Sequence, residues 1–345
     1  MCRTELKRNL NNFVTKIWYP LHKHSWGWVT WLLAPIACMY YAFHLIHKTI
    51  VVSFIKREFS IPIIVIGNIT VGGVGKTPLV ITIANKLHSL GLRVGIVSRG
   101  YKAQVKHTPF EVTATDNAIK VGDEPLLLAT NTNCPIVIAK QRIQAVQYLI
   151  TKYQCQVIIS DDGLQHYAMG RSIEIIVIDG QRSFGNGWIL PAGPLRELPK
   201  RLVHSDFVIV NGTQPYNYQF KSYAMRIESS NMLINLATKQ AISIKSLLTP
   251  IAAVAAIGNP QQFFDHLRKL GISIQEYPFP DHHIFSYQDL ACLPEQSIIM
   301  TAKDAVKCKD FACNNWFYLP IAAHVTDAFW YDLSKHTALQ GLLKL

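Results

Sequence analysis

The chain is poor in charged residues, and acidic residues are the scarcer kind. Only 16% of its 345 residues are charged, and 34 Lys and Arg outnumber 22 Asp and Glu to give a formal net charge of +12. So low a charged fraction is unusual for a purely soluble protein. Because 49% of the residues are hydrophobic, a chain of this length can still form two domains with ordinary cores.

Patterned cysteines are also absent, which argues against a zinc site. The seven cysteines show no C-x-x-C spacing, and Cys308 and Cys313 have no second pair of His or Cys to complete a site. An odd, scattered set is typical of a reducing compartment and predicts buried thiols. The globular part lacks a ribbon of basic and aromatic residues, so no nucleic acid partner is predicted.

The basic excess is concentrated at the N-terminal end. Through Arg57 there are eight Lys or Arg against one Glu, so +7 of the net charge lies in the first 57 residues. A basic excess confined to one end favours an anionic membrane surface as the partner over nucleic acid.

The same end contains a long stretch without charge. The window between Lys23 and Lys48 includes WGWVTWLLAPIACMYYAFHLI, and roughly 20 apolar residues suffice to cross a bilayer as a helix. Its aromatic edges and basic flanks are typical of interfacial anchoring. Pro35 would kink the helix, which either spans once or lies in one leaflet. The alternative is a core helix that covers a soluble domain.

The segment Ile61–Asn85 predicts a site for nucleotide phosphates. An apolar strand leads into a glycine-rich turn that ends in Gly75-Lys76-Thr77, and an apolar-periodic helix follows. Backbone amides, a helix N-terminus and a lysine can cradle phosphates, and the threonine hydroxyl can hold Mg²⁺. The predicted nucleotide-binding residues are Thr70, Val71, Gly72, Gly73, Val74, Gly75, Lys76 and Thr77.

This turn departs from the general P-loop pattern at one position. The pattern asks for glycine five residues before Gly75, where the chain has Thr70. Gly72 and Gly73 are expected to supply the lost backbone freedom, because glycine tolerates left-handed conformations. The alternative is a turn that binds nothing, but the order of strand, GKT and helix argues against it.

The rest of the chain alternates apolar strands with helices. QVIIS, IEIIVIDG and DFVIVNG predict strands, and the alternation predicts an α/β fold with a doubly wound, mostly parallel P-loop sheet. Residues from about 213 to 248 lose this rhythm. IAAVAAIGNP, QQFFDHLRKLG and SIIMTAKD then predict strand, helix and strand of a second, smaller α/β domain. The predicted units are residues 1–57, a membrane-associated segment, 58–222, a nucleotide-binding domain, and 223–345, the smaller domain.

Three carboxylates have sequence contexts that suit phosphoryl transfer. Asp161 and Asp162 follow the strand QVIIS, where P-loop enzymes keep the acid that binds Mg²⁺ or its water. The alternative is that they only start a turn with Gly163. Asp123 in GDEP either caps a helix that has Pro125 in its first turn, or receives the proton of an acceptor hydroxyl.

The densest titratable cluster of the C-terminal part is Asp281-His282-His283, in FPDHHIF. Histidine suits proton handling near neutral pH. No third ligand for zinc is evident. A solvent-facing loop is the alternative.

Seven motifs, taken in order, resemble the tetraacyldisaccharide 4'-kinase family, the lipid A 4'-kinases. They are IGNITVGGVGKTP, VSRGYK, VGDEPLLLA, DDGLQH, ILPAGPLRE, FPDHH and TAKDAVK, spread over about residues 60 to 310. The resemblance implies a P-loop lipid kinase on the cytoplasmic face of the inner membrane, with ATP and Mg²⁺ as cofactors. It would phosphorylate the 4'-hydroxyl of a tetraacylated disaccharide 1-phosphate, giving the 1,4'-bisphosphate, and it is expected to be a monomer.

The resemblance also implies roles for single residues. Asp123 with His282 resembles the acid–base pair of the family, and Lys76 would contact the β/γ oxygens. Residues 58–222 would form the kinase domain, and 223–345 would complete the acceptor site, with closure of the two lobes on ATP. The predicted catalytic residues are Asp123, His282, Lys76 and Asp162; the predicted metal ligands are Thr77, Asp161 and Asp162; Ser98 and Arg99 are weaker candidates for phosphate or acceptor contacts.

Two other functions compete with this one. A P-loop ATPase of the partitioning or scaffold type would carry a lysine before its GGVGKT loop, where this chain has Val71. A membrane-bound regulator that binds ATP without chemistry does not explain why Asp123, Asp161 and His282 all occur in kinase-like contexts.

Overall fold

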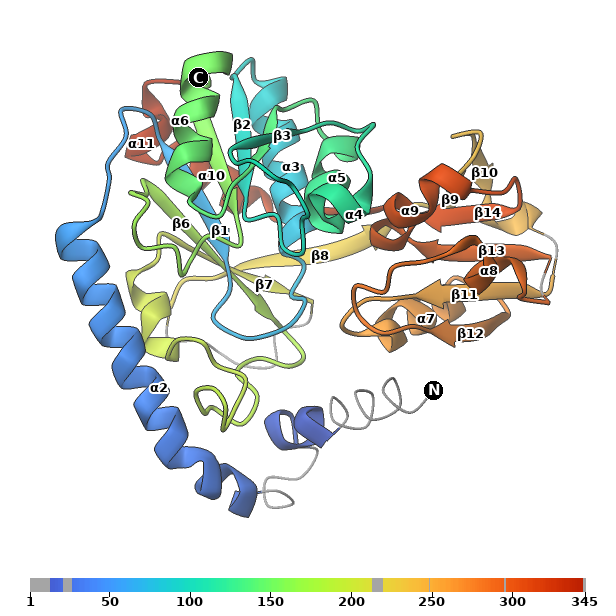
Figure 1. The fold of residues 1–345 in the computed structure, drawn as a ribbon, viewed down its shortest axis with the longest axis horizontal. Coiled ribbons are helices and arrows are strands. Elements are labelled where there is room, and N and C mark those ends of the chain that lie inside the picture. The colour runs from blue at the N-terminus through green and yellow to red at the C-terminus, as the bar shows by residue number, and fades with distance from the viewer. Residues whose placement is uncertain (1–12, 21–26, 213–219, 248, 295, 344–345) are drawn as a thin grey trace.

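Two sheets organise the chain in the computed structural model, which describes residues 13–20, 27–212, 220–247, 249–294 and 296–343 (Figure 1). One sheet has nine strands and the other has six. The predicted α/β fold, with a mostly parallel doubly wound sheet and a second, smaller α/β unit, is confirmed.

The larger sheet has the strand order β15-β8-β7-β6-β1-β5-β2-β4-β3. Its seven inner strands run parallel, and only β3 and β15 at the two edges are antiparallel to their neighbours. The strands are β1 Ile63–Gly67, β2 Val94–Ser98, β3 Phe110–Val112, β4 Ile136–Ile138, β5 Val157–Asp161, β6 Ile173–Asp179, β7 Phe207–Asn211, β8 Tyr223–Ser229 and β15 Ile321–Val325. Because β1 lies between β5 and β6, the loops after β1 and β5 meet at one edge of the sheet.

Helices cover both faces of this sheet. Ile64 and Ile66 of β1 share a core with Leu79 on one face, whereas Ile63 and Val65 face the opposite core. This alternation follows from the period of two along a strand. The helices of this unit are α3 Lys76–Ser89, α4 Ala118–Val121, α5 Asp123–Asn131, α6 Arg142–Tyr153, η1 Pro199–His204, α10 Asp327–Ser334 and α11 Thr337–Gln340.

The smaller sheet has the order β10-β9-β14-β13-β11-β12, with four parallel strands and an antiparallel β9–β10 hairpin at one edge. Its strands are β9 Met232–Asn235, β10 Ala241–Ser243, β11 Ile251–Ala255, β12 Ile274–Pro278, β13 Ser297–Thr301 and β14 Trp316–Leu319; its helices are η2 Ile244–Ser246, α7 Pro260–Lys269, α8 Tyr287–Ala291, α9 Ala302–Cys308 and η3 Lys309–Phe311. The predicted strand SIIMTAKD is too long. Thr301 ends β13 and caps α9 by accepting the Asp304 amide at 3.1 Å.

Sheet membership does not change at the predicted position 222/223. β8 pairs with β7, and β15 returns to pair with β8, so both strands extend the larger sheet. The chain passes to the smaller sheet after Ser229 and returns before Ile321, and these two residues face each other in the β8–β15 ladder. The boundary was predicted from the point at which strands and helices stop alternating in the sequence. That pattern does not show which sheet a following strand joins. The division into 58–222 and 223–345 stays a prediction about domains.

The N-terminal segment contains one long helix, α2 Gly27–Phe54, which lies along the outside of the molecule (Figure 1). Within the predicted segment 1–57, residues 1–12 and 21–26 lie outside the described structure. The helix continues through Pro35 and is long and apolar enough to cross a membrane. Only 11% of its most apolar window is buried, which does not fit a core helix of a soluble domain.

Candidate active site

The glycine-rich turn joins β1 to α3 at the carboxyl edge of the larger sheet. Gly75, the residue before α3, has a left-handed φ of 89°, and a Cβ there would lie 2.8 Å from the Asn211 amide nitrogen. Glycine is therefore required on both conformational and steric grounds. Gly72 also has a positive φ, 113°, as expected for the residue that offsets the loss of glycine at position 70, whereas Gly73 does not.

Thr70 and Val71 bind this turn to the segment that carries ILPAGPLRE. Thr70 is buried and forms a β-bridge with Leu195, and the Val71 amide donates to the Pro194 carbonyl at 2.8 Å. Val74 is buried, and its carbonyl accepts from Asn211 at 3.2 Å. The threonine in place of glycine thus continues a strand-like pairing that fixes the entrance to the turn.

The ammonium group of Lys76 lies between an amide and a carboxylate. Lys76 Nζ donates to Asn68 Oδ1 at 2.9 Å and pairs with Asp162 Oδ1 at 3.3 Å. Thr77, the second residue of α3, is half-buried. Asn68 was not predicted as a site residue; its place directly after β1, in IGNIT, was the available signal.

Asp161 is the last residue of β5, the parallel neighbour of β1, and lies opposite Ile66 in the register; Asp162 follows it. Asp161 is 2% exposed, and its Oδ1 has no hydrogen-bond partner among the described residues. Burial raises the pKa of Asp161 to about 7, and the carboxylates of Glu124 and Asp162 add to the effect. A buried carboxylate oxygen without a partner suits a cation.

Asp162 has a different environment from Asp161. Its backbone is left-handed, with φ of 47°. Burial acts to raise its pKa, but the cations of Lys76, Arg196 and Arg142 outweigh burial and lower it. The two adjacent carboxylates are therefore pushed in opposite directions, and Asp162 is the one held ionised beside Lys76.

The residues present fit Mg²⁺. Asp161 supplies a free carboxylate oxygen, and Thr77 supplies a hydroxyl at the start of the phosphate-binding helix. Among the described residues, no three or more His, Cys, Asp or Glu side chains gather into a complete metal cage. That is the pattern expected for Mg²⁺, which is held by one or two protein groups together with phosphates and water.

Arg142 supports the two aspartates from α6. This side chain is 5% exposed, and its Nη2 donates to the carbonyls of Asp161 and Asp162 at 2.9 and 2.8 Å. No motif in the sequence indicated this role. Ser98 is buried at the end of β2 and Arg99 is exposed, and both stay predictions as phosphate or acceptor contacts.

Asp123 and His282, which are 159 residues apart in the chain, form a hydrogen bond. His282 Nδ1 lies 2.8 Å from Asp123 Oδ2, and the other carboxylate oxygen accepts the Glu124 amide at 2.9 Å. Asp123 is the first residue of α5, and Gly122 precedes it as the N-cap with φ of 91°. Asp123 is therefore not the N-cap residue, although one of its carboxylate oxygens accepts an amide of the first turn. The other carboxylate oxygen faces the second unit.

Two lysines of α9 complete the surroundings of Asp123. Lys303 Nζ and Lys307 Nζ each lie 3.8 Å from Asp123 Oδ2, and Lys303 also pairs with Glu124 at 3.1 Å. Burial acts to raise the pKa of Asp123, but the His282 hydrogen bond and the two lysines lower it to about 2. The motif TAKDAVK contains both lysines but did not predict their role. Their spacing of four places them on one face of a helix.

The cluster Asp281-His282-His283 divides between the site and the surface. His282 has a left-handed φ of 58°, and its ring lies 5.3 Å from that of Tyr101, centroid to centroid. His283 instead contacts Asp289 at 3.4 Å, and Asp281 is exposed. Left-handed residues other than glycine cost about 1–3 kcal/mol and persist where neighbours fix them. The contacts with Asp123 and with the Tyr101 ring hold His282 in this backbone conformation.

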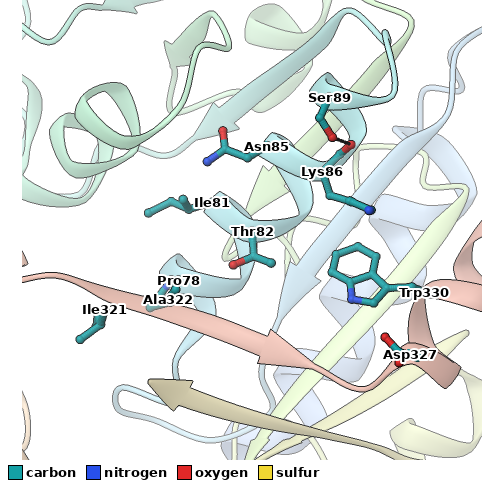
Figure 2. A pocket seen from close by; sticks show the side chains of 10 residues that line it. All are labelled: Pro78, Ile81, Thr82, Asn85, Lys86, Ser89, Ile321, Ala322, Asp327 and Trp330. Atoms are coloured by element: carbon teal, nitrogen blue, oxygen red, sulfur yellow. Dashed lines mark hydrogen bonds between the residues drawn. The ribbon is translucent and has the colours of Figure 1, made fainter. Parts of the chain in front are cut away.

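A separate groove of about 620 Å³ lies on the outer side of α3, between that helix, β15 and α10 (Figure 2). Figure 2 shows Trp330 and Lys86 at one end and Ile321 at the other. Its lining residues are Pro78, Ile81, Thr82, Asn85, Lys86, Ser89, Ile321, Ala322, Asp327 and Trp330. None of the predicted site residues lines it, so the groove is distinct from the phosphate-binding turn.

The arrangement thus contains two connected groups of side chains. Lys76, Asp161 and Asp162 meet at the carboxyl ends of β1 and β5, and Asp123 meets His282 at the contact between α5 and the second unit. The Glu124 carboxylate, next to Asp123, acts on the pKa of Asp161 and so connects the two groups. A phosphate cradle, a cation site and a carboxylate–imidazole pair are the parts that phosphoryl transfer to a hydroxyl requires.

Comparison with known proteins supports this assignment. The family model described as tetraacyldisaccharide-1-P 4'-kinase (LpxK) matches residues 29–338. A tetraacyldisaccharide 4'-kinase from Legionella pneumophila (strain Lens) is 49% identical over 329 residues, 95% of this chain and 98% of its own. One from Haemophilus influenzae (strain 86-028NP) is 41% identical over 334 residues, 93% and 98% of the two chains.

A solved structure agrees with these relatives. The "apo" form of LpxK from Aquifex aeolicus, in complex with ATP, superposes with a TM-score of 0.76 at 25% identity, and the match covers 91% of this chain and 99% of that one. The family inferred from the seven motifs is confirmed, and the chain belongs to the tetraacyldisaccharide-1-P 4'-kinase family.

Proposed function

We propose that this chain transfers the γ-phosphoryl group of ATP to the 4'-hydroxyl of a tetraacyldisaccharide 1-phosphate, giving the 1,4'-bisphosphate. Membership of the kinase family carries the assignment. The pairing of Lys76 with Asp162 at 3.3 Å, beside the buried carboxylate of Asp161, supports it.

Catalysis rests on positioning and charge neutralisation. Lys76 would exchange its contact with Asp162 for the β/γ oxygens, while the amides from Gly72 to Thr77 would hold the phosphates. Thr70 and Val71 fix the entrance of the turn, because the Val71 amide already donates to the Pro194 carbonyl. Thr77, Asp161 and Asp162 would hold Mg²⁺, which when bound would neutralise charge on the transferred group. The cations of Arg142 and Arg196 keep Asp162 ionised.

Asp123 receives the proton of the acceptor hydroxyl, and His282 orients it. A carboxylate with a pKa of about 2 is a weak base, which suits a loose transition state in which the proton is transferred late. Its lysine partners belong to α9, on the second unit. Movement of that unit as the lobes close on ATP therefore adjusts the basicity of Asp123.

A direct assay tests this function. The purified chain is mixed with γ-labelled ATP, Mg²⁺ and a tetraacyldisaccharide 1-phosphate in detergent. Label is expected in the lipid, and none when the lipid is omitted. Release of labelled inorganic phosphate without labelled lipid would instead support the partitioning-type ATPase.

The enzyme acts as a monomer at the cytoplasmic face of the inner membrane, where its N-terminal segment keeps it near the acylated acceptor. The exposed side chains of α2 are large and apolar, including Trp28, Leu32, Ile36, Phe43 and Ile46. Such a face, next to an excess of seven positive charges, suits an anionic bilayer surface.

Deletion of residues 1–57 should release the protein from membranes. Flotation with anionic vesicles measures this, and the full chain should float while the truncated chain stays at the bottom. Because α2 also touches the globular part, the triple change Ile36→Asn, Phe43→Asn and Ile46→Asn is a sharper variant that alters only exposed side chains. Flotation of both variants like the full chain would contradict the membrane role.

A further inference from the structure

We propose that His44 and Lys48 of α2 are positioning residues, which connect the apolar helix to the P-loop lysine through buried polar side chains. The inference rests on the proposed kinase function and extends it. The apolar helix would then influence the catalytic rate as well as hold the enzyme near its acceptor.

The first link joins α2 to the segments DDGLQHY and PLRE. His44 Nε2 lies 3.2 Å from the Tyr167 hydroxyl and 4.0 Å from Glu197 Oε2, and Lys48 Nζ lies 4.0 Å from the same oxygen. The Lys48 ammonium also lies 5.0 Å from the centre of the Tyr167 ring. Both α2 side chains are half-buried, whereas His47, one residue from Lys48, is exposed.

Glu197 is the central group of the connection. It is 3% exposed, and two cations lie near its Oε2, Lys48 Nζ at 4.0 Å and Arg201 Nε at 3.5 Å, beside the His44 imidazole. A buried carboxylate requires such partners, because an unpaired charge in a low-dielectric site is costly. The position of α2 therefore affects how firmly Glu197 is held.

The second link runs from Glu197 to the phosphate-binding turn. Gln165 Nε2 donates to Glu197 Oε1 at 3.0 Å and to the Asn68 carbonyl at 3.3 Å. Asn68 in turn accepts from Lys76 Nζ through Oδ1 at 2.9 Å. The path from α2 to Lys76 thus passes through the side chains of Glu197 and Gln165 and then through Asn68, from its backbone carbonyl to its side-chain oxygen.

A parallel branch reaches the same lysine. Arg196 Nη1 donates to Gln165 Oε1 at 3.3 Å and pairs with Asp162 at 3.5 Å, and Asp162 pairs with Lys76 at 3.3 Å. Gln165 is therefore held at both its oxygen and its nitrogen, and either branch transmits a shift of Glu197 to Lys76. Polar networks of this kind are coupled beyond the sum of their pairs.

The experiment compares His44→Gln, Lys48→Met and the double variant with a matched control, His47→Gln, on the same helix. Two quantities are measured: kcat with acceptor in detergent micelles, and the dissociation constant of a fluorescent ATP analogue without lipid. We expect roughly three- to tenfold lower kcat and weaker nucleotide binding in the double variant, the size typical of coupling mutations. The KM for the lipid should stay within about twofold, since the apolar face is unchanged. Lys48→Arg, which keeps the positive charge, should have the kcat and the nucleotide affinity of the unaltered enzyme.

Three results would overturn the proposal. The first is an unchanged kcat and nucleotide affinity in a double variant that melts at the temperature of the unaltered enzyme. The second is an equal effect in His47→Gln. The third comes from a double-mutant cycle with Glu197→Gln. If the two residues share one path, Lys48→Met and Glu197→Gln together lower kcat by less than the product of the two single fold-changes. A combined loss equal to that product would overturn the proposal. Absence of labelled lipid with the unaltered enzyme would refute the kinase function instead, while the nucleotide measurement still tests the coupling.

Discussion

Changing Lys76 to alanine should lower kcat for transfer to the lipid by roughly 10²–10³-fold, the size seen when one charge-stabilising donor is removed. The ammonium group is held at 2.9 Å from Asn68 and 3.3 Å from Asp162, at the start of the phosphate-binding helix. Without it, charge that develops on the β/γ oxygens would lose the cation that the proposed mechanism places beside them. Rates from the γ-labelled assay give the effect.

Lys86→Ala is the matched control for this change. Lys86 lies on the same helix but is exposed and lines the separate groove on the outer side of α3. It should retain the kcat of the unaltered enzyme to within about twofold. A fully active Lys76→Ala enzyme would remove the P-loop lysine from the mechanism.

Changing Asp123 to asparagine should lower kcat by roughly 10²–10⁴-fold, the contribution of a positioned acid–base group. Asparagine keeps the shape of the side chain but removes its negative charge and its ability to take a proton. His282→Ala should have a smaller effect, and adding it to Asp123→Asn should cost little more, because the imidazole acts through the carboxylate. Asp116→Asn, which breaks an ion pair with Lys120 away from the site, serves as the control.

Folding stability checks whether Asp123→Asn acts through structure alone. A folded pKa of about 2 instead of 3.8 corresponds to about 2 kcal/mol of stability. Since the folded pKa is the lower one, this stability is present above about pH 4 and is lost as the pH falls from about 4 to about 2. The difference in urea midpoint between the enzyme and Asp123→Asn should therefore be large at pH 6 and shrink toward pH 3.

These two outcomes separate catalysis from packing. If Asp123→Asn stays folded at neutral pH and its rate is normal, Asp123 does not take the proton. A difference in midpoint that is constant across pH would show that Lys303 and Lys307 do not hold the ionised carboxylate in the manner that the 3.8 Å distances indicate.

Local patterns were sufficient for the parts of the site that lie in one short stretch of chain. The strand, glycine turn and helix around Lys76 were predictable, since backbone amides, glycine conformations and helix caps act over a few residues. The placement of Asp161 and Asp162 at the carboxyl edge of the sheet also followed, because the parallel strands of a doubly wound sheet end at one edge. Their place beside β1 depended on the strand order. The uncharged window between Lys23 and Lys48 likewise predicted the apolar helix α2, because length and composition of one continuous segment were sufficient.

The contacts between distant segments were decided by the tertiary structure. The return of β15 to the larger sheet and the approach of Lys303 and Lys307 to Asp123 depend on how two sheets pair and pack. Arg142 lies in none of the motifs, and ILPAGPLRE contains Glu197 without indicating its partners. Only their burial, beside the aspartates and beside α2, shows what these two side chains hold. Periodicity and spacing describe neighbours along the chain, whereas a buried charge finds its partners through the whole fold.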